Sequence, residues 1–351
     1  MDRQVYILGE LLGPDDPQVR AIRQLSSVDA SAASARKKNM ARLIEKNRKS
    51  NVLTPSQLRC LSKISTINIT TGCFHNCIYC YTKGYSQYPG DGKVILFSNT
   101  SEKLSEELAR KRNKPQAVYF CPSCDPFQPI PQILDQTYKT METLLKVGIS
   151  VQFVTKAIVP ATFLTLFAKY SNLVCAQVGL TCVDDNIRKI FEPRTATVSE
   201  KLSTLRKLVE IGVTTGARAD PLVYGVMDPD ESLSDLFFAI SEVGVKEIAI
   251  GYLFLRPAIR KSLEKNIKDV QLLCELLKPY SDGSKLPIGM KNSKGLALPK
   301  EIREKAFERI RNIASDFNVS IHICGCKNSD ITTESCHITR NAHPLQTTLF
   351  T

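Results

Sequence analysis

Short β-branched hydrophobic segments alternate with amphipathic segments of helical period from residue 63 onward. Six of the hydrophobic segments have the length and composition of buried strands. They are ISTINIT (64–70), AVYFC (117–121), SVQFVTK (150–156), LVCAQVGLT (173–181), VTTGARA (213–219) and EIAIGYLFL (247–255). Strands that alternate with helices are typical of right-handed βαβ units, so the pattern predicts a parallel sheet.

Three of the predicted helices end at a glycine directly before a β-branched segment, at Gly148, Gly212 and Gly244. Glycine adopts the left-handed conformation at a helix end at little energetic cost. The helix before Gly212 is expected to begin with a capping box of Thr197 and Glu200. Its predicted buried side chains are Leu202, Leu205, Leu208 and Val209, and a helix over 300–316 is expected to pack on the sheet through Ile302, Phe307, Ile310 and Ile313.

Six such units can close partly into a barrel or form an open doubly wound sheet, and periodicity does not choose between them. In both architectures the reactive groups gather at the carboxyl ends of the strands. Chemistry-bearing side chains follow four of the predicted strands at this end: Cys73 the first, Cys121 and Cys124 the second, Lys156 the third, and Thr181 and Cys182 the fourth. The pattern therefore predicts a common site at one edge of the sheet.

The chain has 47 Lys and Arg against 35 Asp and Glu, a formal net charge of +12. The excess is concentrated in RKKNMARLIEKNRK (36–49), within residues 1–60, which we interpret as a helical and basic N-terminal extension. A phosphate-rich partner such as DNA or RNA would explain this charge, and a solvated helix is the alternative.

No apolar run approaches the eighteen or so residues of a membrane span, and the first residues lack the features of a secretory signal. We therefore expect a cytoplasmic protein without a membrane partner. In a reducing compartment, clustered cysteines more often bind metal or carry out chemistry than form disulfides, and the chain has 12 cysteines.

Cys73, Cys77 and Cys80 lie within the stretch INITTGCFHNCIYCYTKGYS (67–86), directly after the first predicted strand. A structural zinc site takes four ligands, and His75 and His337 are available as the fourth. The spacing of four and three residues equally allows three thiolates to surround one iron–sulfur cluster. With a tyrosine before the last cysteine, this CxxxCxxC motif resembles that of the radical S-adenosylmethionine (SAM) enzymes.

The resemblance implies a partial (β/α)6 TIM-type barrel over 61–258, followed by a cysteine-rich C-terminal extension over 259–351. It also implies that the three cysteines hold a 4Fe-4S cluster whose remaining iron binds SAM. An electron from a reductant protein such as a flavodoxin or ferredoxin then cleaves SAM, and the resulting 5′-deoxyadenosyl radical abstracts hydrogen from a substrate.

Further segments resemble the spore photoproduct lyase group and its mostly unassigned relatives: CPSCDPFQP (121–129), FVTK (153–156) and FEPRTATVSEKLSTLRKLVEIGV (191–213). This resemblance implies that Tyr79 lies near the SAM adenine, Lys156 pairs with its carboxylate, Asp125 and Ser123 contact its polar part, and Thr181 reaches the ribose. It favours a nucleic acid or nucleotide as substrate. A peptide or small-molecule substrate, or a non-catalytic metal-stabilised nucleic-acid-binding protein, are the alternatives.

The chain departs from the lyase pattern after the second strand. The lyase group has a hydrogen-atom-donating cysteine in a Cys-x-Ser-Asp pattern, whereas this chain reads Cys121-Pro122-Ser123-Cys124-Asp125. Cys121 or Cys124 can serve as the hydrogen donor. Two cysteines with this spacing can equally bind metal or act as a redox pair.

A second cysteine group lies near the C-terminus, where Cys324, Cys326 and Cys336 are accompanied by His322 and His337. These residues are expected to hold an auxiliary iron–sulfur cluster or a zinc ion, completed by Cys121, Cys124 or a histidine. The remaining cysteines Cys60, Cys175 and Cys274 have apolar neighbours and are expected to be small core residues.

Overall fold

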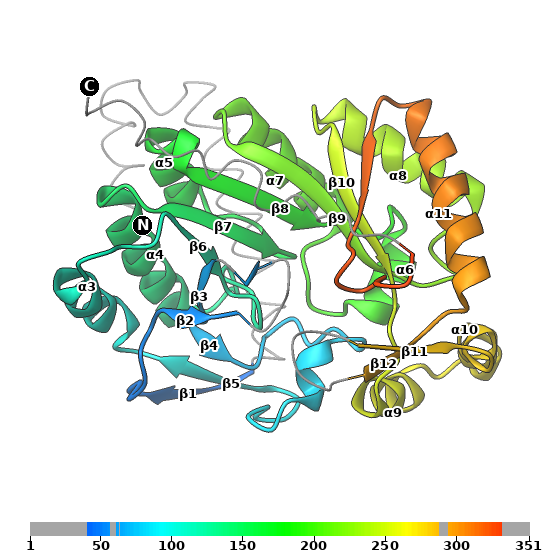
Figure 1. Cartoon of the computed structure of the whole chain (residues 1–351), viewed down its shortest axis with the longest axis horizontal. Helices are drawn as coiled ribbons and strands as arrows, with labels where there is room; N and C mark the ends of the chain where they lie inside the picture. Colours follow the sequence, from blue (N-terminus) through cyan, green and yellow to red (C-terminus); the bar gives the residue numbers. More distant parts are fainter. Residues whose placement is uncertain (1–40, 57–60, 63, 288–293, 332–351) are drawn as a thin grey trace, which may run out of the picture. The chain divides into compact units, whose positions relative to one another are not determined.

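The computed structural model describes residues 41–56, 61–62, 64–287 and 294–331. Apart from residues 41 and 42, these positions belong to one compact unit that spans residues 43–351. Figure 1 shows its strands side by side, with helices α3 to α8 and α11 around them.

The central element is an eight-stranded sheet with the strand order β13-β10-β9-β8-β7-β6-β3-β2. Neighbouring strands from β3 to β13 pair in parallel, and β2 pairs antiparallel with β3 at the edge. The strands are β2 (Thr54–Pro55), β3 (Ser65–Ile67), β6 (Ala117–Phe120), β7 (Ser150–Thr155), β8 (Val174–Gly179), β9 (Thr214–Leu222), β10 (Glu247–Tyr252) and β13 (Ser320–Ile323). All six predicted strands are therefore confirmed.

The parallel strands follow one another in space in the order in which they occur in the chain. Because crossovers are right-handed, this order directs every connecting helix to the same face of the sheet. A doubly wound sheet would instead reverse its direction at a switch point. The predicted partial barrel is confirmed, with β13 as a seventh parallel strand, and the described strands do not close into a full barrel.

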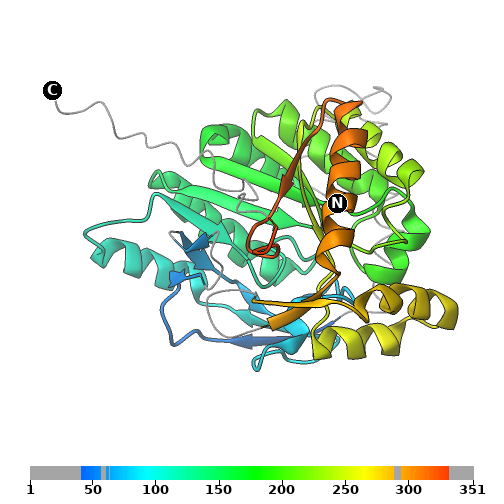
Figure 2. The ribbon, with the colours of Figure 1, turned by 45° about the vertical axis from the view of Figure 1, so that its right-hand side comes forward.

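Nine α-helices lie among the described residues. They are α3 (Thr100–Arg110), α4 (Pro131–Lys146), α5 (Ala161–Lys169), α6 (Asp185–Phe191), α7 (Val198–Glu210), α8 (Asp230–Glu242), α9 (Pro257–Asn266), α10 (Val270–Leu277) and α11 (Lys300–Ser315). Helix α4 packs on β7, α7 on β8 and β9, and α11 on β13 and α8, as Figure 2 shows for α11. The 3₁₀ turns are η3 (Tyr81–Gly84), η4 (Ser171–Leu173) and η5 (Lys278–Tyr280).

The two faces of the parallel sheet differ in composition. Side chains that point toward the helices are apolar and buried, including Val151, Phe153 and Ala217. The inner face, which points away from the helices, carries polar groups such as Gln177 and Arg218 in the alternate positions. A polar inner face is typical of a site that receives a ligand rather than of a sheet buried on both sides.

The local signals at the helix ends are confirmed. Gly148, Gly212 and Gly244 have positive φ angles of 75°, 76° and 80°. The capping box at the start of α7 is present, with Thr197 and Glu200 bonded to each other's backbone. On this helix Leu205 and Leu208 are fully buried, as predicted. Leu202 and Val209 lie at the margin of the buried face, and Lys201 and Thr204 are buried instead.

The described part of the predicted helical extension is not helical. Residues Arg42–Lys46 form strand β1, which lies in a three-stranded sheet of order β1-β5-β4 with β5 (Lys93–Phe97) and β4 (Thr70–Thr71). Pairing with β5 supplies backbone hydrogen-bond partners, and this tertiary contact outweighs the helical composition of the segment. Residues 1–40 and 57–60 lie outside the described part of the chain.

The core position expected for Cys274 is wrong. Cys274 is exposed on α10, because the buried face of that short helix is formed around Leu276. The antiparallel pair β11 (Ser284–Pro287) and β12 (Lys294–Ala297) follows η5 in the chain. Helix α11 packs as predicted, through Phe307 and Ile310. None of the described helices is both long enough and apolar enough to cross a bilayer.

Candidate active site at the carboxyl ends of the parallel strands

The three-cysteine loop begins where β4 ends. Gly72 has a φ of 83°, and a Cβ atom there would lie 2.7 Å from the Lys93 carbonyl oxygen and from a Pro89 side-chain carbon, so only glycine fits. The loop is tied to the barrel by the Phe74 N–H, which donates to Gln128 Oε1 over 2.7 Å. A second tie joins the Ile78 N–H to the Phe191 carbonyl over 2.9 Å.

Cys73, Cys77 and Cys80 lie within electrostatic reach of one another. Burial raises the pKa of the Cys73 and Cys77 thiols, and nearby negative groups raise it further. In the part of the chain that the structure describes, no three His, Cys, Asp or Glu side chains converge as a site for a single metal ion. Thiolates that bind three different iron atoms of one cluster do not need to meet at a point, and an all-cysteine donor set is the one that iron–sulfur clusters use. The all-cysteine donor set therefore fits an iron–sulfur cluster.

His75 is not positioned as a fourth ligand. Its Nδ1 atom lies 3.0 Å from the Arg194 carbonyl oxygen, and its Nε2 atom lies 3.2 Å from Asp125 Oδ2. Both ring nitrogens are thus engaged within the protein, and the ring joins the cysteine loop to the segment after β6.

A buried carboxylate, Glu192, connects the residues predicted to contact SAM. The side chain of Glu192 is fully buried and follows α6. Its Oε1 atom accepts hydrogen bonds from Lys156 Nζ at 2.8 Å, from Thr181 Oγ1 at 3.4 Å and from the Tyr79 hydroxyl. Its Oε2 atom accepts from Lys201 Nζ at 2.6 Å and from Thr195 Oγ1 at 3.2 Å. We call these six residues the Glu192 cluster.

The charges of the Glu192 cluster are strongly coupled. Burial alone would raise the pKa of Glu192, but Lys156 and Lys201 outweigh this effect and hold the pKa well below its usual range. Burial would lower the pKa of Lys156, but the Glu192 carboxylate raises it overall. For Lys201, burial prevails and lowers the pKa. Glu192 is therefore ionised, and Lys156 is a charged ammonium group at the edge of the cluster.

Lys156 is held in place by its neighbours. A Cβ atom on Gly179 of β8 would lie 2.7 Å from Lys156 Cγ and 2.9 Å from its Nζ, so the glycine leaves room for this side chain. The Lys156 ammonium lies 5.7 Å from the centre of the Tyr79 ring, which stacks on Phe191 at 6.5 Å. Three of the predicted cofactor-contacting residues, Tyr79, Lys156 and Thr181, thus share one network.

A family model described as the Radical SAM superfamily matches residues 67–238. The match begins at β3, contains the three-cysteine loop and the Glu192 cluster, and ends within α8. Residues 67–238 form a radical SAM domain. The prediction of an enzyme family is thereby confirmed.

The chain is similar to an uncharacterised protein, ORF301, of Acidianus two-tailed virus, at 24% identity over 52% of the chain and 64% of the relative. It is also similar to the radical SAM Nalpha-GlyT isomerase of Pseudomonas phage M6, at 26% identity over 55% of the chain and 41% of the relative. The aligned region thus covers less than two thirds of the length of either relative.

The fold is similar to that of spore photoproduct lyase. A variant of that enzyme with bound AdoMet and dinucleoside spore photoproduct superposes with a TM-score of 0.64, at 14% identity, over 80% of this chain and 81% of the lyase. A second variant gives a TM-score of 0.62 at 15% identity over the same shares of the two chains. At this level of identity the similarity establishes the radical SAM fold.

Asp125 has all of its carboxylate oxygens engaged by the protein. It accepts from the Phe127 N–H at 2.9 Å, the Lys156 N–H at 2.7 Å and the Thr155 hydroxyl at 2.8 Å, and it pairs with His75. Burial would raise its pKa, but His75 and the backbone donors outweigh this and lower the pKa. Asp125 therefore ties the ends of β6 and β7 to the cysteine loop, and its contact with the polar part of SAM stays a prediction.

Ser123 and the two cysteines around it occupy the turn that follows β6. The Ser123 N–H donates to Asn68 Oδ1 over 2.9 Å. This bond holds the Ser123 backbone against the residue that directly follows β3. Cys121 is buried, and Cys124 is partly exposed in the same turn. The structure places these three residues beside the cysteine loop, at the edge of the sheet that the sequence predicts.

Cys324 and Cys326 lie on the inner face of the sheet. Cys324 is buried against Tyr119 and Ala249, and Cys326 packs against the same cluster. Cys336 and His337 lie outside the described residues. An auxiliary iron–sulfur or zinc site therefore stays a prediction.

Sequence reasoning missed Glu192, Lys201 and Asn68 as site residues. Glu192 and Lys201 are inside the FEPRTATVSEK segment, but a buried ion pair gives no local sequence signal, because a lysine on an amphipathic helix ordinarily faces solvent. The one available signal is the pair of cations at Lys156 and Lys201, which lie on either side of Glu192 in the matched segments.

Proposed function

We propose that this protein is a radical SAM enzyme that holds a 4Fe-4S cluster on Cys73, Cys77 and Cys80, cleaves SAM reductively and acts on a nucleic acid or nucleotide. The observation that carries the proposal is the Glu192 cluster, which joins three predicted cofactor contacts beside the cysteine loop. When bound, the reduced cluster supplies the electron that converts SAM into methionine and a 5′-deoxyadenosyl radical.

The protein's own residues position the cofactor in this proposal. Lys156 is the member of the Glu192 cluster with exposed surface, since 16% of its side chain is accessible against 1% for Lys201. Its ammonium is suited to pair with the carboxylate of SAM, because a charge-assisted hydrogen bond in a partly buried site is stronger than one in water. Lys201 keeps Glu192 ionised, and Glu192 in turn keeps Lys156 charged and directed toward the rim.

Tyr79 and Thr181 have complementary roles. The Tyr79 hydroxyl is bonded to Glu192, so its ring, rather than its hydroxyl, is available to an adenine base. Thr181 is fully buried with its hydroxyl toward Glu192, and we expect it to fix the carboxylate instead of reaching the ribose. Asp125 and Ser123 are expected to shape the loop around the cofactor.

Three observations support a nucleic-acid or nucleotide substrate. The net charge is +12. One of the similar solved structures, the spore photoproduct lyase variant with bound AdoMet, also contains a dinucleoside spore photoproduct, and that protein shares the fold of this chain. The inner face of the sheet also presents polar side chains, which suits a heteroatom-rich substrate better than an apolar one.

The proposal is tested by anaerobic reconstitution with iron and sulfide, followed by reduction and addition of SAM. We expect iron and sulfide to bind in equal amounts and 5′-deoxyadenosine to form, as measured by chromatography and mass spectrometry. Cys77→Ser should abolish the product, and Cys274→Ser, a change at an exposed cysteine on α10, should retain it. Bound zinc in place of iron, or no 5′-deoxyadenosine from the wild type, would reject the proposal.

The substrate class is tested separately, by the salt dependence of binding to DNA and RNA oligonucleotides. Neutralised phosphates make the logarithm of the binding constant fall linearly with the logarithm of salt concentration. A steep negative slope is expected. If neither nucleic acid binds in a salt-dependent way, the peptide or small-molecule alternative replaces the nucleic-acid one.

A further inference from the structure

The turn after β6 brings two thiols together. The Cys124 N–H donates to the Cys121 carbonyl over 3.3 Å, which closes a four-residue turn from Cys121 to Cys124. In such a turn the first and last Cα atoms lie within about 7 Å, and a disulfide requires roughly 4.4–6.8 Å. The two thiols also lie close enough for each to shift the pKa of the other. The backbone therefore already has the reach that a disulfide between them needs.

The environment of this turn differs from that of a structural cysteine. Cys121 has a φ of 55°, a left-handed conformation that residues other than glycine rarely adopt. Cys124 has a polar neighbour, since its thiol lies 3.6 Å from Asn68 Oδ1. An inert buried cysteine is typically surrounded by apolar side chains instead.

A cation is held beside both thiols. The Arg48 guanidinium is electrostatically coupled to Cys124 and Cys121 and stacks 4.1 Å from the centre of the Phe97 ring. It donates to the Asn68 carbonyl, so Asn68 touches both the arginine and the cysteine turn. Among the described residues, the buried Nε atom of Arg48 has no hydrogen-bond partner. A fixed positive charge favours the thiolate form of a neighbouring cysteine.

We propose that Cys121 and Cys124 form a redox-active dithiol that closes reversibly to an intramolecular disulfide by exchange with a small-molecule disulfide such as oxidised glutathione. The exchange uses neither a metal nor SAM, so the inference does not rest on the proposed function. The Tyr81 hydroxyl donates to the Pro122 carbonyl within the same turn and helps to fix its geometry.

The two cysteines have different roles in the exchange. Cys124 is the more exposed of the two, so its thiolate attacks the incoming disulfide, forms a mixed disulfide and releases one glutathione thiolate. Cys121 is 4% exposed; it then loses its proton and attacks the Cys124 sulfur, which releases the second glutathione. The net change is one thiol, one thiolate and one glutathione disulfide converted into the protein disulfide, one glutathione and one glutathione thiolate. The protein pair is oxidised by two electrons, and the external disulfide is reduced.

The test uses full-length protein freed of metal by a chelator under anaerobic conditions and equilibrated over a series of reduced-to-oxidised glutathione ratios. After acid quenching and alkylation, trypsin releases a peptide of residues 113–139, in which Cys121 and Cys124 are the cysteines present. We expect this peptide to lose two hydrogens in mass and both alkylation sites in one transition. The exposed Cys274 should show only an ordinary mixed disulfide.

Variants separate the two roles. Cys121→Ser should accumulate glutathione on Cys124, whereas Cys124→Ser should leave Cys121 largely unmodified. Arg48→Gln should slow alkylation of Cys124 at neutral pH several-fold without preventing closure of the disulfide. The inference is overturned if the wild-type peptide keeps two free thiols, or carries only glutathione adducts, at ratios that fully modify Cys274. Because the measurement is made without metal, such a failure leaves the proposed enzymatic function untouched.

Discussion

Two buried carboxylates in this barrel are each flanked by two cations, yet their surroundings differ. Glu192 lies between Lys156 and Lys201, and its own side chain is completely inaccessible. Asp220, near the end of β9, lies between Arg218, whose Nη2 atom is 2.6 Å away, and Lys327. Both groups have the same formal charge balance, one anion to two cations.

The two carboxylates differ in the solvent exposure of the cations that flank them. Lys201 is 1% exposed, whereas 15% of Arg218 and 30% of Lys327 is accessible. Glu192 also accepts hydrogen bonds from three hydroxyl groups, so its cluster is closed within the protein. A closed cluster positions its members, while a partly open one retains cations that water can screen. Burial, not charge count, therefore decides how much each carboxylate contributes to stability.

The largest expected effect is that of Glu192→Gln. This change preserves the shape of the side chain but leaves Lys201 as a buried, unpaired cation. Breaking a buried pair in this way destabilises a protein by about 3–5 kcal/mol, as urea unfolding would measure. Glu304→Gln is the control, because the exposed pair of Glu304 with Lys300 at 3.7 Å should contribute at most about 1 kcal/mol. Equal losses in the two variants would contradict the role given to burial.

An intermediate effect is expected for Asp220→Asn, together with a distinct pH dependence. Burial would raise the pKa of Asp220, but Lys327 and Arg218 lower it to about 2. A depressed pKa means that the stabilisation is fully present above the unfolded-state value of about 3.9 and is lost as the pH falls toward 2. The shift corresponds to roughly 2 kcal/mol.

The measurement is the free energy of unfolding of the wild type and of Asp220→Asn between pH 6 and pH 2. The difference between the two proteins should shrink through this acid range, because all other carboxylates are shared and cancel. A difference that stays constant down to pH 2 would show that Asp220 is not held ionised by its two cations.

The smallest effect is expected for Gly179→Ala, which moves a member of the Glu192 cluster without removing any charge. The new methyl group would lie 2.7 Å from Lys156 Cγ, so the flexible lysine side chain must shift, at a cost of about 1 kcal/mol. Gly216→Ala on the neighbouring strand is the matched control, since its nearest contact would be 3.4 Å. Urea unfolding should rank Gly179→Ala as the more damaging of the two.

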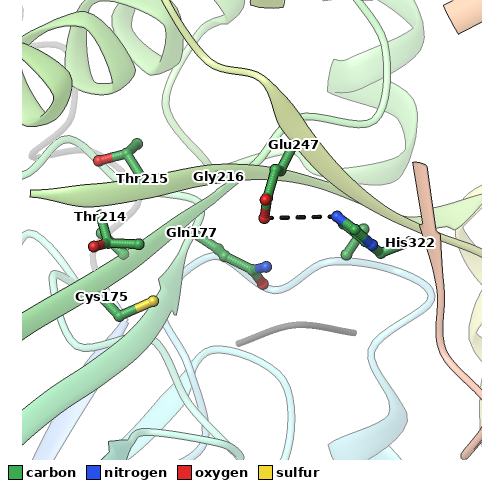
Figure 3. A pocket seen from close by; sticks show the side chains of 9 residues that line it. Cys175, Gln177, Thr214, Thr215, Gly216, Glu247 and His322 are labelled. Atoms are coloured by element: carbon green, nitrogen blue, oxygen red, sulfur yellow. Dashed lines mark ion pairs between the residues drawn. The ribbon is translucent and has the colours of Figure 1, made fainter. Parts of the chain in front are cut away.

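A small cavity at the amino ends of the parallel strands is lined by another group of polar side chains. Figure 3 shows Glu247 and His322 facing each other there, with Gln177 and Cys175 nearby, and the ion pair measures 3.5 Å. This group lies at the amino ends of the strands, away from the cysteine loop. Cys175 is therefore partly buried beside polar neighbours, and not in the apolar core environment that was expected for it.

Local patterns predicted much of the fold. The β-branched segments, the glycines at 148, 212 and 244, and the Thr197–Glu200 capping box each act over a few residues, so composition alone reveals them. The strand β1 was missed because its partner β5 lies about fifty residues away in the chain. Pairing with a distant strand overrode the helical composition of that segment.

For the site, the sequence alone was enough to identify three cysteines at a strand end. It also identified a lysine, a threonine and a tyrosine at positions that one edge of a parallel sheet brings together. The connection of these groups through Glu192 and Lys201, and the internal hydrogen bonds that occupy the Asp125 carboxylate, became visible only in the folded chain. The physical reason is that periodicity encodes which face a side chain occupies. The protonation and the partners of a buried charge depend instead on groups from distant segments, which meet only when the barrel is formed.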